Sequence, residues 1–250
     1  LAAIESLKKF LQRPKKFPSL EAQKLWKGLF YSMWFSDKPR PQQRLAADLG
    51  ELFLIIPNQN YKVFCASFWF VICKEWSSID HHRLDKFLLL VRRVLFNQIK
   101  KLKQEEWNQD LVQQFLATLR EIPLSGSQKI PNGIPFHLID IYGDELERLL
   151  FEGIHEEEGD EEDEELAKIQ EEKKQAIEEA PLKELLKPFE ELRKTALFKP
   201  LREKIRDDLL KDPRLIEWNA VESSETTEAK SESKSEAKAD NSDDEWEGFD

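Results

Sequence analysis

The chain has 250 residues, a length that fits one domain of ordinary size, with or without tails. Hydrophobic residues make up 40% of it and aromatic residues 10%, which is enough for a buried core and excludes a wholly disordered chain. Only 8 residues are glycine, too few for the turns of sandwiches, barrels or glycine-rich nucleotide folds, so we expect a mostly helical protein. No run of about 18 apolar residues occurs, so we expect no membrane span and no membrane partner.

Charge is distributed unevenly along the chain. Residues 1–150 carry 22 Lys and Arg against 16 Asp and Glu, a net charge of +6, whereas residues 151–250 carry 16 against 33, a net charge of −17. The overall net charge of −11 therefore describes neither half. A basic, aromatic-rich body with an acidic appendage suggests a surface for polyanions or for an acidic partner.

Prolines and apolar residues at helical spacing divide the first 150 residues into seven predicted helices. In chain order they are predicted at residues 1–11, 19–34, 41–56, 61–76, 78–102, 105–122 and 135–149. Ser19 is expected to cap the second helix, and Ser77 or Ser78 the fifth. Short links make consecutive helices antiparallel neighbours, so residues 1–150 predict an all-α scaffold domain. The fold is either an irregular HEAT- or armadillo-like helical repeat or a helical bundle.

The remaining residues are expected to form three segments. Residues 151–181 combine an acidic linker, with nine acids and one glycine at residues 156–165, and a helix-prone stretch. Residues 182–219 regain a helical pattern of mixed charge and predict short helices that dock on the body or on partners. Residues 220–250 are rich in Ser, Glu, Lys and Asp, which predicts a disordered acidic tail.

The fifth predicted helix has the most informative charge pattern. Its apolar residues share one face, and basic residues cover most of the rest. No acid occurs between Asp85 and Glu105, although a solvated helix face usually mixes both signs. This basic strip therefore predicts contact with RNA phosphates or with an acidic partner, and a merely solvated face is an equal alternative. The basic strip consists of Arg83, Lys86, Arg92, Arg93, Lys100, Lys101 and Lys103. A second basic group at the first helix is expected to extend it: Lys8, Lys9, Arg13, Lys15 and Lys16.

Cysteines and histidines do not form a recognisable chemical site. Cys65 and Cys73 lie on one predicted helix, roughly 12 Å apart by the helical rise, which is too far for a disulfide. They are typical of small buried hydrophobic residues in a reducing compartment. The four histidines lack the spacing of metal ligands, and no glycine-rich phosphate loop or hydrolase motif occurs. We therefore expect no enzymatic activity, no metal or cofactor, and no small-molecule substrate.

Three ordered stretches carry a family signature. They are residues 24–34 (KLWKGLFYSMW) followed by 36–39 (SDKP), residues 83–95 with RLDKF and LVRRVL, and residues 133–142 (GIPFHLIDIY). Together they resemble the eukaryotic ribosomal RNA-processing protein 1 family, nucleolar proteins of the Nop type. The acidic segment and the tail are similar to that family only in character.

The resemblance implies a non-catalytic assembly factor in the nucleus, within the nucleolus. Such proteins act on precursors of the large ribosomal subunit and are required for maturation of ribosomal RNA without cutting it. The implied partners are the precursor particle, its ribosomal RNA, ribosomal proteins and other assembly factors, Brix-domain proteins among them. The residues themselves leave a second function class open, a general HEAT-like adaptor for transport or signalling that does not bind RNA.

Protein-partner contacts are expected at two places. One is the end of the second helix, with Trp34, Phe35, Asp37 and Lys38, where a place in the core is the favoured alternative for Trp34. The other is the tail, where Trp246 and Phe249 are equally consistent with anchors for a partner groove and with incidental aromatic residues.

Overall fold

The computed structural model describes residues 2–154 and 163–221, and over these ranges it is helical with no strand. This confirms the predicted all-α class. The helices of the first 150 residues are α1 (Ala2–Leu11), α2 (Ser19–Trp34), α3 (Pro39–Ile55), α4 (Asn58–Glu75), α5 (His81–Gln104), α6 (Gln109–Glu121) and α7 (Gly133–Leu150). They are followed by α8 (Asp163–Glu179), α9 (Leu182–Thr195), α10 (Lys199–Lys204) and α11 (Pro213–Glu217). A 3₁₀ turn, η1 (Trp76–Ser78), precedes α5, and a π-helical turn, η2 (Ile205–Leu209), extends α10.

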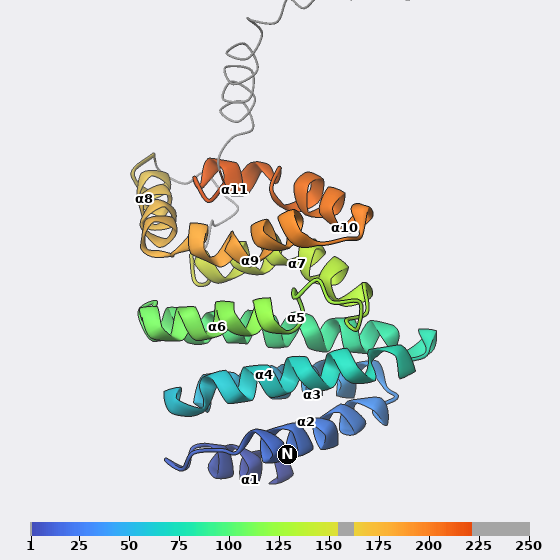
Figure 1. The fold of residues 1–250 in the computed structure, drawn as a ribbon. Coiled ribbons are helices and arrows are strands. Elements are labelled where there is room, and N and C mark those ends of the chain that lie inside the picture. The colour runs from blue at the N-terminus through green and yellow to red at the C-terminus, as the bar shows by residue number, and fades with distance from the viewer. Residues whose placement is uncertain (1, 155–162, 222–250) are drawn as a thin grey trace, which may run out of the picture.

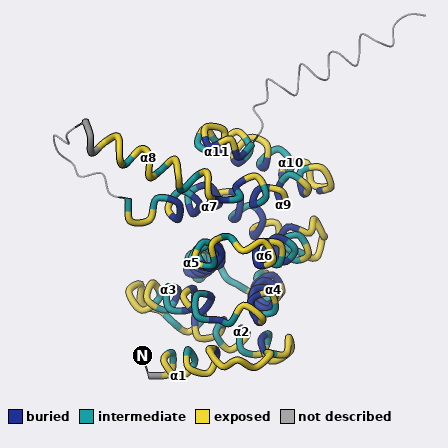
Figure 2. Tube along the Cα trace, turned by 90° about the vertical axis from the view of Figure 1, so that its left-hand side faces the viewer, coloured by how far each residue is buried: buried dark blue, intermediate teal, exposed yellow. Residues whose placement is uncertain are grey.

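The helices stack in two layers along the length of the molecule (Figure 1). One layer contains α1, α3, α5 and α7, and the other contains α2, α4, α6 and α9. In each layer a helix packs on the one two places further along the chain, and α9 continues the second layer by packing on α6. Figure 2 shows the two layers as two columns. This arrangement is that of a helical repeat rather than of a closed bundle.

The segment after residue 181 continues both layers. Its first helix, α9, packs on α6, while α10 and η2 pack on α7. The Tyr142 hydroxyl on α7 donates to the Leu185 carbonyl oxygen on α9 over 2.9 Å, in the core. The short helices therefore close the upper end of the repeat in Figure 1.

Several helix starts differ from those expected. The side chain of Asp80 caps α5 by accepting from the Arg83 amide over 3.2 Å, whereas Ser77 and Ser78 lie in η1. Ser19 is the first residue of α2, Pro18 holds the cap position, and no side chain caps this helix. The expected serine caps are therefore wrong, because a preceding proline and a better-placed aspartate begin these helices instead.

The core between α2, α3 and α4 is rich in aromatic residues. The ring of Trp26 on α2 lies 5.6 Å from that of Phe53 on α3, and 5.1 and 4.9 Å from those of Phe64 and Phe68 on α4. The three pairs are stacked, tilted and edge-to-face respectively, and such geometries add specificity to apolar burial. The buried Gln98 holds α5 to α4, because its carbonyl oxygen accepts from the Tyr61 hydroxyl and its side-chain oxygen from the Trp69 indole.

Helices α3 and α5 make the closest approach at Gly50. A Cβ atom at this position would lie 2.7 Å from Asn97 Nδ2 and 2.8 Å from the Arg93 carbonyl oxygen. The neighbouring atoms belong partly to backbone, so they have little freedom to move away. Glycine is therefore required here for packing between helices.

We expect Gly50→Ala to lower the free energy of unfolding by about 1–3 kcal/mol through overpacking. Gly28→Ala on α2 is the matched control, since a Cβ there meets nothing within 4 Å. It should raise stability by up to about 1 kcal/mol, because alanine favours the helix. Urea unfolding of both variants measures the difference, and equal effects would contradict the tight contact.

Candidate interaction surfaces

The basic strip of α5 lies largely between helices rather than in solvent. Helix α5 packs on α3 and on α7, so both of its flanks are covered. Lys86 and Lys101 are 5% and 7% exposed. Neighbouring helices cover these two residues, so they offer little surface to RNA or to an acidic partner.

Lys86 secures the end of α2. Its ammonium donates to the carbonyl oxygens of Trp34 and Ser36 over 2.6 and 2.8 Å. Carbonyls at a helix C-terminus have no partner inside the helix, and a cation there satisfies them. Burial lowers the pKa of Lys86, opposed by the charge of Asp37.

Most other cations of the strip pair with α7. Arg92 pairs with Glu145 and lies 3.3 Å from Asp144, while Lys100 lies 2.6 Å from Glu152. Lys103 donates to the Leu149 carbonyl oxygen over 2.7 Å at the end of α7, and burial lowers its pKa. The acids missing from α5 are thus supplied by the next helix in the layer.

Of the three other members of the strip, Arg83 and Lys101 pair with acids at the two ends of α5. Arg83 binds the cap residue Asp80, and its guanidinium lies 4.8 Å over the ring of Trp34. Lys101 lies 2.8 Å from Glu105, and this contact lowers the pKa of the glutamate. Arg93 differs, because no acid among the described residues pairs with it and its Nε lacks a hydrogen-bond partner there.

A charged network continues from α5 through α7 to α11. Glu145 is completely buried and lies between Arg92 and Arg148, the latter at 3.3 Å. Arg148 in turn lies 3.7 Å over the ring of Phe96. Arg214 of α11 lies 3.1 Å from Asp144 and 2.5 Å from Glu147. The network therefore ties the upper helices to the centre of the repeat.

We expect Glu145→Ala to lower the free energy of unfolding by about 2–3 kcal/mol, since it leaves two guanidinium groups without their buried carboxylate. Both arginines are partly exposed to water, which limits the loss in unfolding free energy to this range. Glu147→Ala, which removes a more exposed pair, should cost less than about 1 kcal/mol. Chemical denaturation distinguishes the two, and a Glu145 variant as stable as the parent would disprove the role.

The second basic group is divided by the fold. Lys8 lies 3.3 Å from Glu51 of α3, on the same layer as the strip, and Lys9 is exposed beside it. Arg13 lies 5.4 Å over the ring of Phe10. The exposed residues Lys15 and Lys16 line, with Arg13, a small cleft near the start of α4. Only the first part of this group therefore extends the strip.

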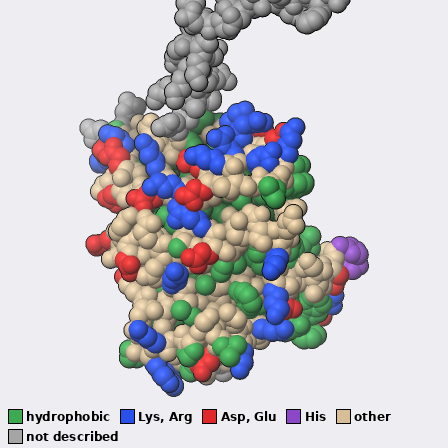
Figure 3. Space-filling model, in the orientation of Figure 1, with side chains coloured by type: hydrophobic (Ala, Val, Ile, Leu, Met, Phe, Trp, Pro, Cys, Tyr) green, Lys and Arg blue, Asp and Glu red, His purple; other side chains and the backbone are tan. Residues whose placement is uncertain are grey.

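The C-terminal end of α2 exposes aromatic surface. Phe35 is 74% exposed, and its ring lies 6.4 Å from that of Tyr31. Trp34 is half-buried against Phe30 and Phe87, so it belongs partly to the core. Figure 3 shows hydrophobic side chains gathered towards the right-hand edge of this face, near the histidines.

The other predicted contact residues are divided between the surface and the tail. Asp37 and Lys38 are exposed directly after α2. Trp246 and Phe249 lie outside the described residues.

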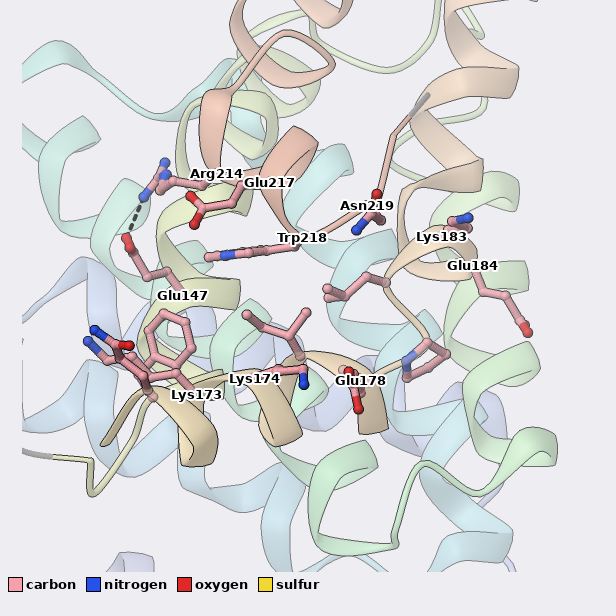
Figure 4. A pocket seen from close by; sticks show the side chains of 16 residues that line it. Glu147, Lys173, Lys174, Glu178, Lys183, Glu184, Arg214, Glu217, Trp218 and Asn219 are labelled. Carbon is pink, nitrogen blue, oxygen red and sulfur yellow. Dashed lines mark hydrogen bonds and ion pairs between the residues drawn. The ribbon is translucent and has the colours of Figure 1, made fainter. Parts of the chain in front are cut away.

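A cleft of about 930 Å³ between α8 and α11 was not expected from the sequence (Figure 4). Phe151, Ile177, Leu182 and Trp218 provide its apolar lining. Charged residues of both signs surround them: Glu147, Lys173, Lys174, Glu178, Lys183, Glu184, Arg214 and Glu217.

Three side chains that could take part in chemistry, those of His137, Cys65 and Cys73, are hydrogen-bonded or buried within the fold. His137 donates from Nε2 to the Leu88 carbonyl oxygen over 3.0 Å, and burial lowers its pKa. Cys65 and Cys73 are buried, and burial raises the pKa of Cys73 to about 12. Within the described residues, no group of three or more His, Cys, Asp or Glu side chains is placed to hold a metal ion. The helices described there are also too short or too polar to cross a membrane.

The described residues form a two-layer helical repeat that exposes basic and aromatic surfaces. The family model of the nucleolar protein Nop52 matches residues 1–249, and the chain belongs to this family. This confirms the resemblance drawn from the three signature stretches. It also supports the expected class, a ribosome-biogenesis factor, and its nucleolar localisation.

Curated relatives carry the same name across animals. Human ribosomal RNA processing protein 1 homolog B is 39% identical over 134 residues, which cover 53% of this chain and 18% of that protein. Human homolog A is 35% identical over 153 residues, which cover 59% of this chain and 33% of that protein. The Drosophila melanogaster homolog is 34% identical over 128 residues, which cover 49% of this chain and 18% of that protein. The chain thus spans a third or less of the length of these relatives.

Proposed function

We propose that the chain is a non-catalytic scaffold in assembly of the large ribosomal subunit precursor, where it supports processing of ribosomal RNA. The match to the Nop52 family over nearly the whole chain carries this proposal. It favours this function over a general transport or signalling adaptor, and it agrees with the names of the relatives, which are ribosomal RNA processing proteins.

A stacked repeat suits this role because it holds distant surfaces in fixed geometry. The proposed partners are the precursor particle, its ribosomal RNA, ribosomal proteins and other assembly factors, Brix-domain proteins among them. Exposed cations neutralise RNA phosphates without reading sequence. The aromatic end of α2 and the cleft beside α8 offer apolar surface to protein segments.

The aromatic end of α2 gives the first test. Phe35→Ser should reduce co-sedimentation of the tagged chain with large-subunit precursors, because an exposed aromatic anchor is lost. Leu20→Ser at the opposite end of α2 is the matched control, since Leu20 is 62% exposed. It should leave co-sedimentation unchanged, and both variants should keep the parent melting temperature. Absence of the parent chain from nucleoli and from precursor fractions would refute the proposed function.

A second test concerns catalysis. Purified protein should not cleave precursor RNA in the presence of Mg²⁺ or Mn²⁺, because a nuclease needs metal-binding carboxylates or a histidine acid–base pair in one pocket. Asp140, one of the isolated acids, is paired with Lys204 at 2.5 Å. Cleavage that persists through purification and disappears on substitution of Asp37, Asp85 or Asp140 would overturn the scaffold role.

A further inference from the structure

A depression of about 290 Å³ crosses the layer of α1, α3, α5 and α7. We call it the Arg93 pocket. Its charged lining contains four cations, Lys8 from α1, Arg93 and Lys100 from α5, and Arg148 from α7, and one acid, Glu51 from α3. The α3, α5 and α7 part of this layer forms the left-hand column of Figure 2, where the three helices lie side by side.

Arg93 is the cation of this pocket that has no partner among the described residues. Lys8 lies 3.3 Å from Glu51, Lys100 lies 2.6 Å from Glu152, and Arg148 lies 3.3 Å from Glu145. By contrast, Arg93 forms no ion pair with any described residue, and its Nε is shielded from water without an acceptor there. A shielded donor with no acceptor is unfavourable, so a ligand that accepts from it gains affinity.

The walls of the pocket are held in place before any ligand arrives. Asn97 donates to the Arg93 carbonyl oxygen over 2.8 Å, directly against Gly50 of α3. The Arg148 guanidinium and the Lys100 ammonium lie 3.7 and 5.7 Å over the Phe96 ring. Because these side chains are already held in place, a ligand that binds there loses little free energy to ordering them, which favours affinity.

We propose that the Arg93 pocket binds a phosphate of a single-stranded RNA backbone, with the Arg93 guanidinium as principal donor. The proposal rests on the proposed function and adds the site at which RNA is held. A guanidinium matches a phosphate through paired N–H donors, and such charge-assisted bonds are strong. Lys8, Lys100 and Arg148 line the pocket beside it, each held in place by an ion pair with an acid.

The adjoining surface favours a polyanion over a single acidic side chain. Arg40 and Arg44 on α3 precede Ala47 and Glu51 of the pocket at helical spacing, so they lie on the same face of that helix. Both arginines are exposed, and no described acid pairs with them. A row of unpaired cations leading into the pocket suits successive phosphates of one strand.

The test measures binding of the full chain to a 20-nucleotide oligouridylate by fluorescence anisotropy over a salt series. Arg93→Gln should weaken binding about tenfold and reduce the slope of log affinity against log salt by about 0.7, the value for one lost phosphate contact on a single strand. Arg93→Lys should restore the slope but only part of the affinity, because a lysine keeps the charge and loses the planar fork. Melting temperatures should stay at the parent value, since the Arg93 guanidinium has no described partner.

Arg193→Gln is the matched control. Arg193 lies on α9 in the opposite layer, outside the pocket, and its Nε also lacks a partner among the described residues. The proposal is overturned if Arg93→Gln binds like the parent, or if Arg193→Gln loses as much affinity. It is also overturned if Arg93→Gln weakens binding of a 20-residue polyglutamate peptide but not of oligouridylate, which would assign the pocket to an acidic protein.

Failure of the pocket proposal can be distinguished from failure of the proposed function. If the parent chain co-sediments with precursor particles while Arg93→Gln binds oligouridylate normally, the pocket alone is refuted. If the chain binds oligouridylate through Arg93 but never enters the particle, the pocket stands and the assembly role fails.

Discussion

The enclosure of α5 between α3 and α7 is the constraint on which the rest of the structure depends. A helix with this many cations can be covered on both sides only if its neighbours supply acceptors, since an unpaired charge out of water is costly. The end of α2 supplies carbonyl oxygens to Lys86, and α7 and the turn after it supply carboxylates to Arg92 and Lys100. The order of the layer is thereby specified by charge as well as by apolar packing.

The same constraint explains why the three signature stretches share one region of the fold. Lys86, in the second stretch, binds the carbonyl oxygens of Trp34 and Ser36, at the end of the first. His137, in the third stretch, binds the carbonyl oxygen of Leu88, again in the second. Residues separated by about a hundred positions are thus joined through α5, so these stretches mark the interfaces between repeats.

The helices could be predicted from the sequence, because apolar spacing and proline act locally. The burial of the basic strip could not be predicted, since the acids that pair with Arg92 and Lys100 lie about fifty residues further along, on α7 and in the turn after it. Periodicity shows which side chains share a face but not which helix covers that face. The Arg93 pocket and the cleft beside α8 were hidden for the same reason, because each is lined from several helices.

Counting basic residues therefore overstates the surface available to RNA. A cation that already pairs with an acid or with carbonyl oxygens has little left to offer a phosphate, and among the described cations of α5 Arg93 is the one without such a partner. Reversing the charge of Arg92 or Lys100 would place like charges against Glu145 or Glu152 and separate α5 from α7. Lost particle association in such a variant would reflect a loosened scaffold, whereas the same loss on substitution of Arg93, with stability unchanged, would report a contact with the ligand itself.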